Sequence, residues 1–122
     1  MAKTILIVDD SSSVRIVLAT TLKSAGYNVI DAVDGEDGLS KLTGEKIHLI
    51  ISDVNMPKMD GITMVKKIKT LPKYKFTPIC MLTTESEESK MKQGKMAGAK
   101  AWIVKPFQPA VLLSAVEKLV LP

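Results

Sequence analysis

Acidic, hydroxyl and ammonium side chains follow successive apolar runs of this sequence, each at the point where a run ends. The residues concerned are Asp9 and Asp10, Asp53, Thr83 and Thr84, and Lys105. If the runs are parallel strands of an open sheet, the residues beyond their carboxyl ends meet at one edge, which is where ligands bind. We therefore expect three carboxylates, a hydroxyl group and an ammonium group to share one site.

The chemistry of these groups suits a divalent cation and a phosphoryl group. Three crowded carboxylates repel one another, and Mg²⁺, which binds carboxylate, carbonyl and water oxygens, offsets that repulsion. Lys105 supplies a second positive charge. Phosphoryl transfer needs an in-line nucleophile and neutralised equatorial oxygens. A carboxylate can be that nucleophile, and it would become an aspartyl phosphate.

Each feature taken alone has a simpler structural explanation. An Asp pair after a strand is often a turn or a helix cap, a Lys near an Asp is more often an ion pair, and Thr is common in strands. His48 has apolar neighbours, and we assign it a structural role. The prediction of a site depends on the conjunction of these groups at the ends of successive strands.

Five segments predict the strands. Ile5–Val8, Ile47–Ile51 and Ile79–Leu82 are nearly continuous aliphatic runs, typical of parallel strands buried on both faces. Asn28–Val33 and Ala101–Val104 are shorter candidates, and Asp34-Gly35 after the second strand is typical of a turn.

Segments of helical periodicity separate the strands. The first helix begins after the N-cap candidates Ser11 and Ser12 and ends at Gly26. Leu39 and Leu42 mark a short second helix. Met64, Ile68 and Leu71 mark a third, which Pro72 is expected to stop, and Leu112, Val116 and Leu119 mark the last, which begins near Pro109. Glu85–Ala97 has few apolar residues and predicts a marginal helix. The βα unit repeated five times predicts one doubly wound α/β domain over residues 1–122.

Composition and charge exclude several classes of protein. The 122 residues are 46% hydrophobic and 25% charged, as in ordinary globular domains, and we expect neither a membrane span nor a secretion signal. The single cysteine, Cys80, fits a reducing cytosol. Residues 1–61 carry a net charge of −3 and residues 62–122 one of +7. The basic half has no arginine and aromatic residues are 4% of the chain, which favours a solvated basic face, open to an acidic protein partner, over a nucleic-acid site.

Together these motifs resemble the receiver domain of two-component response regulators over the whole chain. The matching segments are Val8–Asp10, Asp53–Gly61, Thr83 and Lys105–Phe107. The sequence is most similar to chemotaxis regulators that consist of a receiver domain alone. The resemblance implies a flavodoxin-like (βα)5 fold with a five-stranded parallel sheet in the order 2-1-3-4-5, and no fused output domain.

The resemblance also implies roles for the acidic residues. Asp53 would accept a phosphoryl group from a phosphohistidine on a separate histidine kinase. Asp10, Asp53 and the backbone carbonyl of Asn55 would hold Mg²⁺, and Asp9 would reach the ion through water. Asn55 and Glu85 would border the phosphoryl group and affect its removal by water.

Three further residues would transmit the signal in such a family member. Lys105, joined to Pro106 by a cis peptide bond, would pair with the phosphoryl oxygens. The Thr83 hydroxyl would move towards the phosphate, and an aromatic residue three positions before the lysine would follow it. Here that residue is Trp102, where tyrosine or phenylalanine is commoner, so coupling of the tyrosine type is open.

The implied function is a cytoplasmic, monomeric signalling switch that is not an enzyme, although it would promote its own phosphorylation and dephosphorylation. Its partners would be a chemotaxis histidine kinase, a phosphatase and the flagellar motor switch protein, with neither nucleic acid nor membrane. The output face would comprise Glu85–Ala97, the fifth strand and the last helix, with basic residues at Lys90, Lys92, Lys95 and Lys100. The alternative within the family is a phosphate sink or a relay receiver that does not act on the motor.

Two readings outside the family remain for comparison. A phosphatase of the haloacid dehalogenase kind would use a carboxylate two residues after its nucleophile, where this chain has Asn55. A flavodoxin-like FMN carrier would bind phosphate after the first strand, where Asp9 and Asp10 place negative charge.

Overall fold

Buried aliphatic strands form the centre of the molecule, as the apolar runs predict. In the computed structural model, which describes residues 2–122, five strands form one sheet. The strands are β1 (Thr4–Val8), β2 (Asn28–Ala32), β3 (Leu49–Ser52), β4 (Ile79–Thr83) and β5 (Ala101–Val104). All neighbours pair in parallel in the order β2-β1-β3-β4-β5, which confirms the predicted fold class and strand order.

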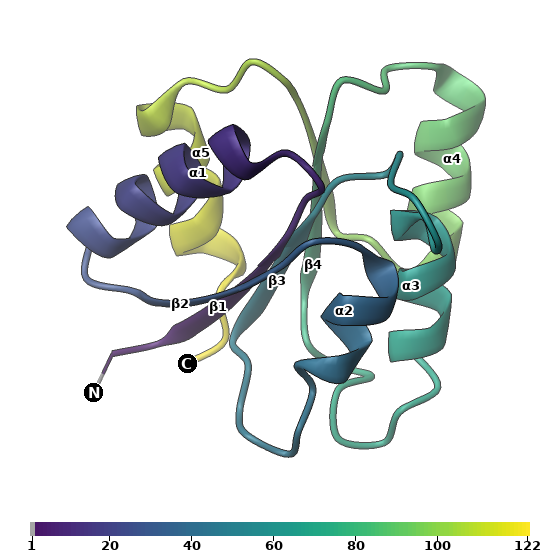
Figure 1. Cartoon of the computed structure of the whole chain (residues 1–122), viewed down its shortest axis with the longest axis horizontal. Coiled ribbons are helices and arrows are strands. Elements are labelled where there is room, and N and C mark those ends of the chain that lie inside the picture. The colour runs from purple at the N-terminus through teal and green to yellow at the C-terminus, as the bar shows by residue number, and fades with distance from the viewer. Residues whose placement is uncertain (1) are drawn as a thin grey trace.

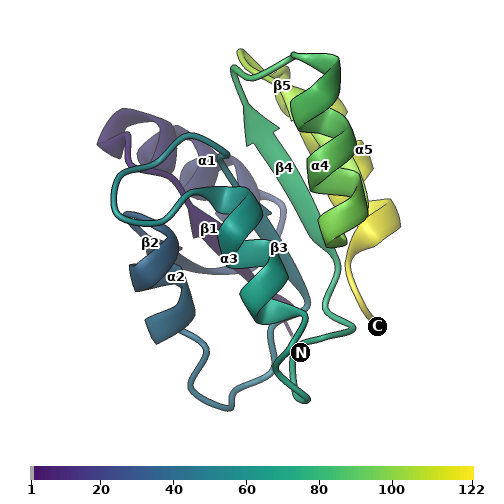
Figure 2. The ribbon, with the colours of Figure 1, turned by 90° about the vertical axis from the view of Figure 1, so that its right-hand side faces the viewer.

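Five helices cover both faces of this sheet. They are α1 (Ser12–Ser24), α2 (Gly35–Ser40), α3 (Gly61–Ile68), α4 (Glu88–Ala97) and α5 (Pro109–Leu119). Helices α1 and α5 lie on one face, and α2, α3 and α4 lie on the other (Figure 1 and Figure 2). Among residues 2–122, no helix has both the length and the apolar character needed to cross a bilayer.

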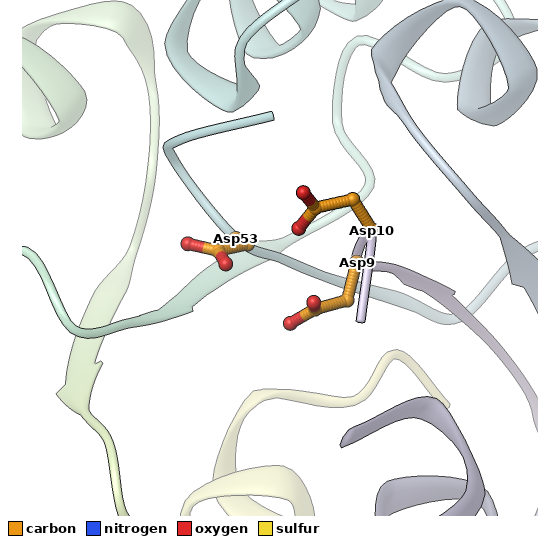
Figure 3. A group of neighbouring side chains, drawn as sticks. All are labelled: Asp9, Asp10 and Asp53. Atoms are coloured by element: carbon orange, nitrogen blue, oxygen red, sulfur yellow. The ribbon is translucent and has the colours of Figure 1, made fainter. Parts of the chain in front are cut away.

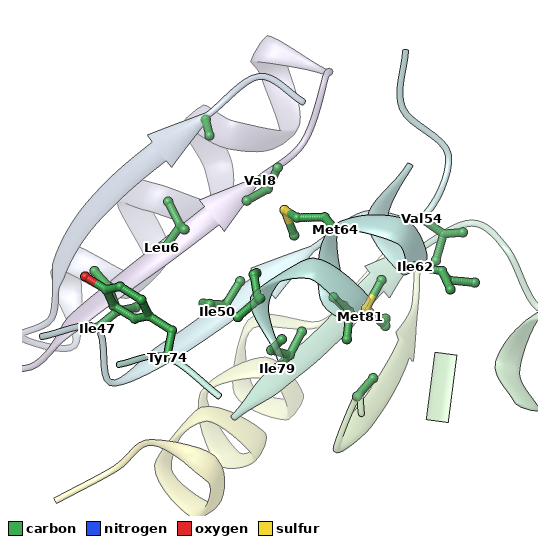
Figure 4. Packing of buried hydrophobic residues seen from close by; sticks show 14 residues of the cluster. Leu6, Val8, Ile47, Ile50, Val54, Ile62, Met64, Tyr74, Ile79 and Met81 are labelled. Atoms are coloured by element: carbon green, nitrogen blue, oxygen red, sulfur yellow. The ribbon is translucent and has the colours of Figure 1, made fainter. Parts of the chain in front are cut away.

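Each face of the sheet has its own apolar layer. Because side chains alternate along a strand, Leu6 and Ile50 pack with Met64 towards α2–α4 (Figure 4), whereas Ile5 packs with Leu18 towards α1 and α5. Each such fully buried side chain stabilises the fold by about 1.5–3 kcal/mol. Cys80 belongs to the second layer, and burial raises the pKa of its thiol to about 12, so it acts as an apolar core residue.

Two helices end earlier than the periodicity predicts. α3 ends at Ile68, and α2 ends at Ser40, so Leu71 and Leu42 lie outside them and Pro72 is not what stops α3. In both places the chain tightens into turns of the three-residue type: the amide of Leu71 donates to the carbonyl of Ile68, and that of Leu42 to the carbonyl of Leu39. The apolar side chains still pack on the core from these turns.

Polar side chains set the starts of two helices, α2 and α4. Asp34 lies in the bend after β2, as the predicted turn requires, but Gly35 already belongs to α2, which Asp34 caps by accepting a hydrogen bond from the Asp37 amide at 2.8 Å. α4 begins at Glu88 rather than Glu85, because the Glu85 amide donates to the Thr83 hydroxyl and so is drawn away from a helical path.

The third strand begins at Leu49, two residues later than predicted, so His48 lies just before it. The His48 amide donates to the Thr4 carbonyl, and its Nδ1 accepts from the Thr4 amide at 3.0 Å. These bonds agree with the structural role that we assigned to His48.

Candidate functional site

Three carboxylates meet at the carboxyl edge of the sheet. Asp9 and Asp10 follow β1, and Asp53 follows β3, the neighbouring strand. One oxygen from each lies within 4.8 Å of the others (Figure 3). Asp9 and Asp53 are buried, whereas Asp10 is exposed, so the cluster opens to solvent on the Asp10 side.

Backbone hydrogen bonds hold the two buried carboxylates in place. Val8 and Ser52 are paired across β1 and β3, and the Asp53 amide donates to the Val8 carbonyl at 2.9 Å. Asp53 Oδ1 then accepts from the Val54 amide at 2.6 Å. Asp9 Oδ1 accepts from the Ser11 amide at 2.9 Å. The strand register therefore fixes the backbone positions of these acids, and hydrogen bonds from the following loops fix the orientation of their carboxylates.

Lys105 bridges the two buried acids. Its Nζ lies 2.6 Å from Asp9 Oδ2 and 3.0 Å from Asp53 Oδ2. Burial by itself would lower the pKa of Lys105, but the hydrogen bonds to Asp9 and Asp53 and the charges of these residues outweigh it, so the pKa is raised. The Lys105–Pro106 peptide bond is cis, as the resemblance implied.

The donor set fits a hard divalent cation. Three carboxylates and one ammonium group leave an excess of negative charge at the edge, and oxygen ligands of this type are those that Mg²⁺ prefers. The resemblance implies that Asp10, Asp53 and the backbone carbonyl of Asn55 would hold the ion, with Asp9 reaching it through water, and the structure brings the three carboxylates of this set together.

The Thr83 hydroxyl is buried at the end of β4 and accepts a hydrogen bond from the Glu85 amide at 3.1 Å. Thr84, the next residue, is exposed beside Lys105 on the rim of a neighbouring groove. Of the two threonines at this edge, Thr83 is therefore the one buried in the β4–α4 corner.

Trp102 packs against α4 and reaches the same loop as Thr83. Its indole Nε1 donates to the Glu85 carbonyl at 2.8 Å. A Cβ at Gly94 would lie 2.6 Å from the indole Cζ3, so only glycine leaves room for the ring. Glu85 thus bonds Trp102 through its carbonyl and Thr83 through its amide.

Asn55 and Glu85 face each other across the mouth of the site. Asn55 Nδ2 donates to Glu85 Oε2 at 3.3 Å, which links the loop after β3 to the loop after β4. Both side chains are at least partly open to solvent. Their place beside a phosphoryl group on Asp53 stays a prediction from the resemblance.

Arg15 is a residue that the sequence reading missed. Its Nη1 donates to the Asp9 carbonyl at 2.6 Å, and its Nε lies 3.3 Å from Asp31 Oδ2 on β2. Arg15 therefore holds the Asp9 backbone, whereas Lys105 holds the Asp9 side chain. A lone arginine in the first turn of the helix after an Asp pair was the available signal.

The comparisons with known proteins identify the family. A model of the response regulator receiver domain matches residues 5–117. The chain belongs to the response regulator receiver family. Among curated relatives, the Chemotaxis protein CheY homolog of Campylobacter jejuni is 39% identical over 115 residues, which cover 93% of this chain and 88% of that protein.

Two solved structures of CheY proteins are also similar to this receiver domain. Vibrio cholerae CheY4 is 45% identical, with a TM-score of 0.93 over 98% of this chain and 99% of its own. The CheX-CheY-BeF3-Mg²⁺ complex of Borrelia burgdorferi includes a chain that is 35% identical, with a TM-score of 0.88 over 95% of this chain and 87% of its own.

Gly61 provides a test of how closely this receiver site is packed. Its position lies against the Asp53 backbone, and a Cβ there would overlap the Asp53 carbonyl oxygen. We expect Gly61→Ala to lower the free energy of unfolding by about 3 kcal/mol, because backbone cannot move aside as a side chain can. Urea denaturation measures the change.

Gly38→Ala is the matched control for Gly61→Ala. The nearest atom to an added Cβ at Gly38 is the flexible end of Met64, at 2.8 Å, and alanine favours the helix. Its cost should be about 1 kcal/mol or less. Equal losses in the two variants would contradict the close packing of Asp53.

Proposed function

We propose that this receiver domain is a phosphorylation-dependent signalling switch rather than an enzyme with an external substrate. It would take a phosphoryl group from a histidine kinase onto Asp53, with Mg²⁺, and then bind a target protein. The observation that carries this proposal is the Asp53 carboxylate, held 3.0 Å from Lys105 beside two further carboxylates.

In the proposed reaction, an oxygen of Asp53 attacks the phosphorus atom of a phosphohistidine. The new P–O bond forms as the P–N bond breaks, and the bonding electron pair leaves with the imidazole, giving an aspartyl phosphate. Mg²⁺, when bound, supplies charge neutralisation to the phosphoryl oxygens. Lys105 would turn from the Asp53 carboxylate to a phosphoryl oxygen, keeping an ion pair throughout.

The phosphodonor needs a surface beside Asp53, and α1 and α5 offer one. A groove of about 500 Å³ lies between them, lined by Val14, Val17 and Phe107 and bounded by Lys105. Val17, one of its apolar lining residues, is 53% exposed. We propose that a helix bearing the phosphohistidine packs along this groove.

The Borrelia relative supports the metal and a second protein partner. The complex that contains it includes Mg²⁺, BeF3 and the protein CheX. BeF3 resembles a phosphoryl group in shape and charge, so a similar acidic pocket with Mg²⁺ suits such a group. A phosphatase as a further partner of this chain is proposed from the family resemblance.

The phosphoacceptor is tested by intact mass spectrometry after incubation with acetyl phosphate and Mg²⁺. We expect one phosphoryl adduct on the wild-type chain, lost in Asp53→Asn and lost when EDTA removes the metal, because the nucleophile and the neutralising charge are then absent. Lys105→Met should retain the metal ligands and give a smaller yield.

Asp60→Asn is the matched control for Asp53→Asn, since it is also an aspartate-to-asparagine change and Asp60 only caps α3. It should retain the adduct. An adduct that persists in Asp53→Asn, or none at all on folded wild-type protein, would contradict the proposed function.

The switch would run through the Glu85 loop. A phosphoryl group on Asp53 offers a new acceptor to the buried Thr83 hydroxyl, and a move of Thr83 would disturb the Glu85 amide that now donates to it. The Glu85 carbonyl is held by Trp102. α4 has no side-chain cap at Glu87 and buries only Gly94, so it can shift at little cost.

Trp102, the single tryptophan, reports this movement. We expect its fluorescence to change when acetyl phosphate and Mg²⁺ are added to the wild-type chain. Thr83→Ala should form the phosphoryl adduct and show little fluorescence change, because the hydroxyl that links Asp53 to the loop is gone. Mass and emission are measured on the same sample, and an unaltered response in Thr83→Ala would count against this route.

The target would bind at the groove between α4 and β5. This groove, of about 560 Å³, is lined by Lys92, Lys95, Lys100 and Trp102. Lysines around an indole suit an acidic peptide with an apolar side chain, and relatives named as chemotaxis proteins favour the flagellar motor switch protein as its source. The alternative is a phosphate sink or relay receiver, which would leave this groove without a motor ligand.

Charge reversal tests the target groove. A peptide from the motor switch protein of the same organism should bind the phosphorylated chain about tenfold or more weaker in Lys92→Glu/Lys95→Glu, since two attractive charges become repulsive. The control is Lys66→Glu/Lys67→Glu, an equal charge change on exposed lysines of α3. Fluorescence anisotropy gives both affinities, and equal values would exclude this groove.

We also propose that the protein acts as a monomer in the cytoplasm. Every proposed contact is supplied by one chain, and the single cysteine is buried in the core, which fits a reducing compartment.

A further inference from the structure

A second basic groove lies at the opposite end of the sheet from Asp53. It has a volume of about 250 Å³ and is formed by the loops before β3 and β4 together with the end of the chain. In Figure 1 these loops lie at the lower edge of the molecule. We call it the distal groove, and its lining includes Lys46, Ile47, Lys73, Phe76 and Leu121.

Hydrogen bonds fix the two loops that form the distal groove. The buried Tyr74 hydroxyl donates to the Glu45 carbonyl at 2.7 Å and accepts from the Gly44 amide at 2.8 Å, which joins one loop to the other. Lys69 Nζ donates to the carbonyls of Lys75 and Thr77, at 3.1 and 2.8 Å. The surface is therefore preorganised, and a ligand need not order it.

Phe76 is the most exposed large apolar side chain of this fixed surface. It is 80% exposed, and Lys75 Nζ lies 5.1 Å from the centroid of its ring. Since the carbonyls on both sides of Phe76 are held by Lys69, the loop cannot easily turn the ring inwards. A phenyl ring held in water beside a small apolar groove is typical of a contact site for a partner.

The charge around the distal groove is positive. Lys46 and Lys73 line it from its two loops, and Lys75 lies beside Phe76. Lys46, Lys73 and Lys75 are all exposed, and Glu45 is the acidic residue that adjoins them in the sequence. A ligand for this surface must therefore be acidic and must offer an apolar group to Phe76.

We propose that the distal groove binds an acidic segment of a partner protein, with one aliphatic side chain packed against Phe76. The cations are lysines, which form point contacts, and one phenyl ring gives no stacking platform, so nucleic acid is disfavoured. A concave groove fits a single protruding side chain of a protein better than it fits the flat surface of a bilayer. Because the groove and Asp53 lie at opposite ends of β3, binding should be independent of phosphorylation.

The test uses the whole chain and a fluorescein-labelled peptide of glutamates around one central leucine. We expect binding by anisotropy, with amide shifts in ¹⁵N spectra at residues 45–47 and 73–77. Phe76→Ser and Lys46→Glu/Lys73→Glu should each weaken binding about tenfold or more. Replacement of the leucine by glycine should weaken it similarly.

Lys66→Glu/Lys67→Glu is the matched control, because it makes the same charge change on α3 outside the groove. Binding should stay within about twofold of wild type. An equal loss in this control would mean diffuse attraction and would overturn the proposal. So would the absence of binding, or shifts confined to the α4–β5 groove.

Further probes separate the distal groove from other partners and from the proposed function. Anionic phosphatidylserine vesicles or a DNA duplex that bind in a Phe76-dependent way, where the peptide does not, would replace the proposal. A doubling of mass in sedimentation that Phe76→Ser abolishes would identify a second copy of this chain as the occupant. Peptide binding should be equal with and without acetyl phosphate and Mg²⁺, so failure of phosphorylation would leave this result intact.

Discussion

Repulsion among Asp9, Asp10 and Asp53 is the constraint on which the rest of the structure depends. Charges about 5 Å apart at an effective dielectric constant near 20 repel by about 3 kcal/mol per pair, and oxygens of these acids lie within 4.8 Å of one another. Lys105 offsets part of this, but only because β1, β3 and β5 bring their carboxyl ends to one edge. Two apolar layers supply the free energy that offsets this repulsion. The cluster can then bind a cation or receive a phosphoryl group.

The tryptophan at position 102 changes how the site is joined to the α4 face. Phenylalanine has no donor to offer the Glu85 carbonyl, whereas the indole N–H donates to it at 2.8 Å. The larger ring also needs space, and Gly94 supplies it, since a Cβ there would lie 2.6 Å from the ring. The glycine that weakens α4 as a helix therefore makes room for the side chain that holds the β4–α4 loop. The tryptophan at position 102 and the weakness of α4 therefore have the same cause, because the ring needs a glycine at position 94.

The sequence was informative where a residue type has one dominant use. Continuous aliphatic runs predicted three strands and shorter apolar segments the other two, and the polar residues after them predicted the acidic cluster, because parallel topology leaves them one place to meet. Helix ends were less predictable: Leu42 and Leu71 keep the apolar period but lie in turns, so periodicity reports burial rather than helical backbone. Arg15 was missed although it stands in the first turn after the Asp pair, because one of its partners is a backbone carbonyl, which the sequence does not identify.

The charge asymmetry of the chain corresponds to two separate regions of the fold, the acidic edge of the sheet and the basic helices and loops. The acids of the first half include all three that gather after β1 and β3, where negative charge has a chemical use. Ten of the eleven lysines of the second half lie on α3, α4, α5 or the loops around α3 and α4, and the eleventh, Lys105, is the one that the acids themselves hold. A basic chain can therefore keep an acidic site, because the sheet separates the edge that attracts cations from surfaces that attract acidic partners. Net charge alone, which would suggest nucleic acid, averages over two surfaces of opposite sign.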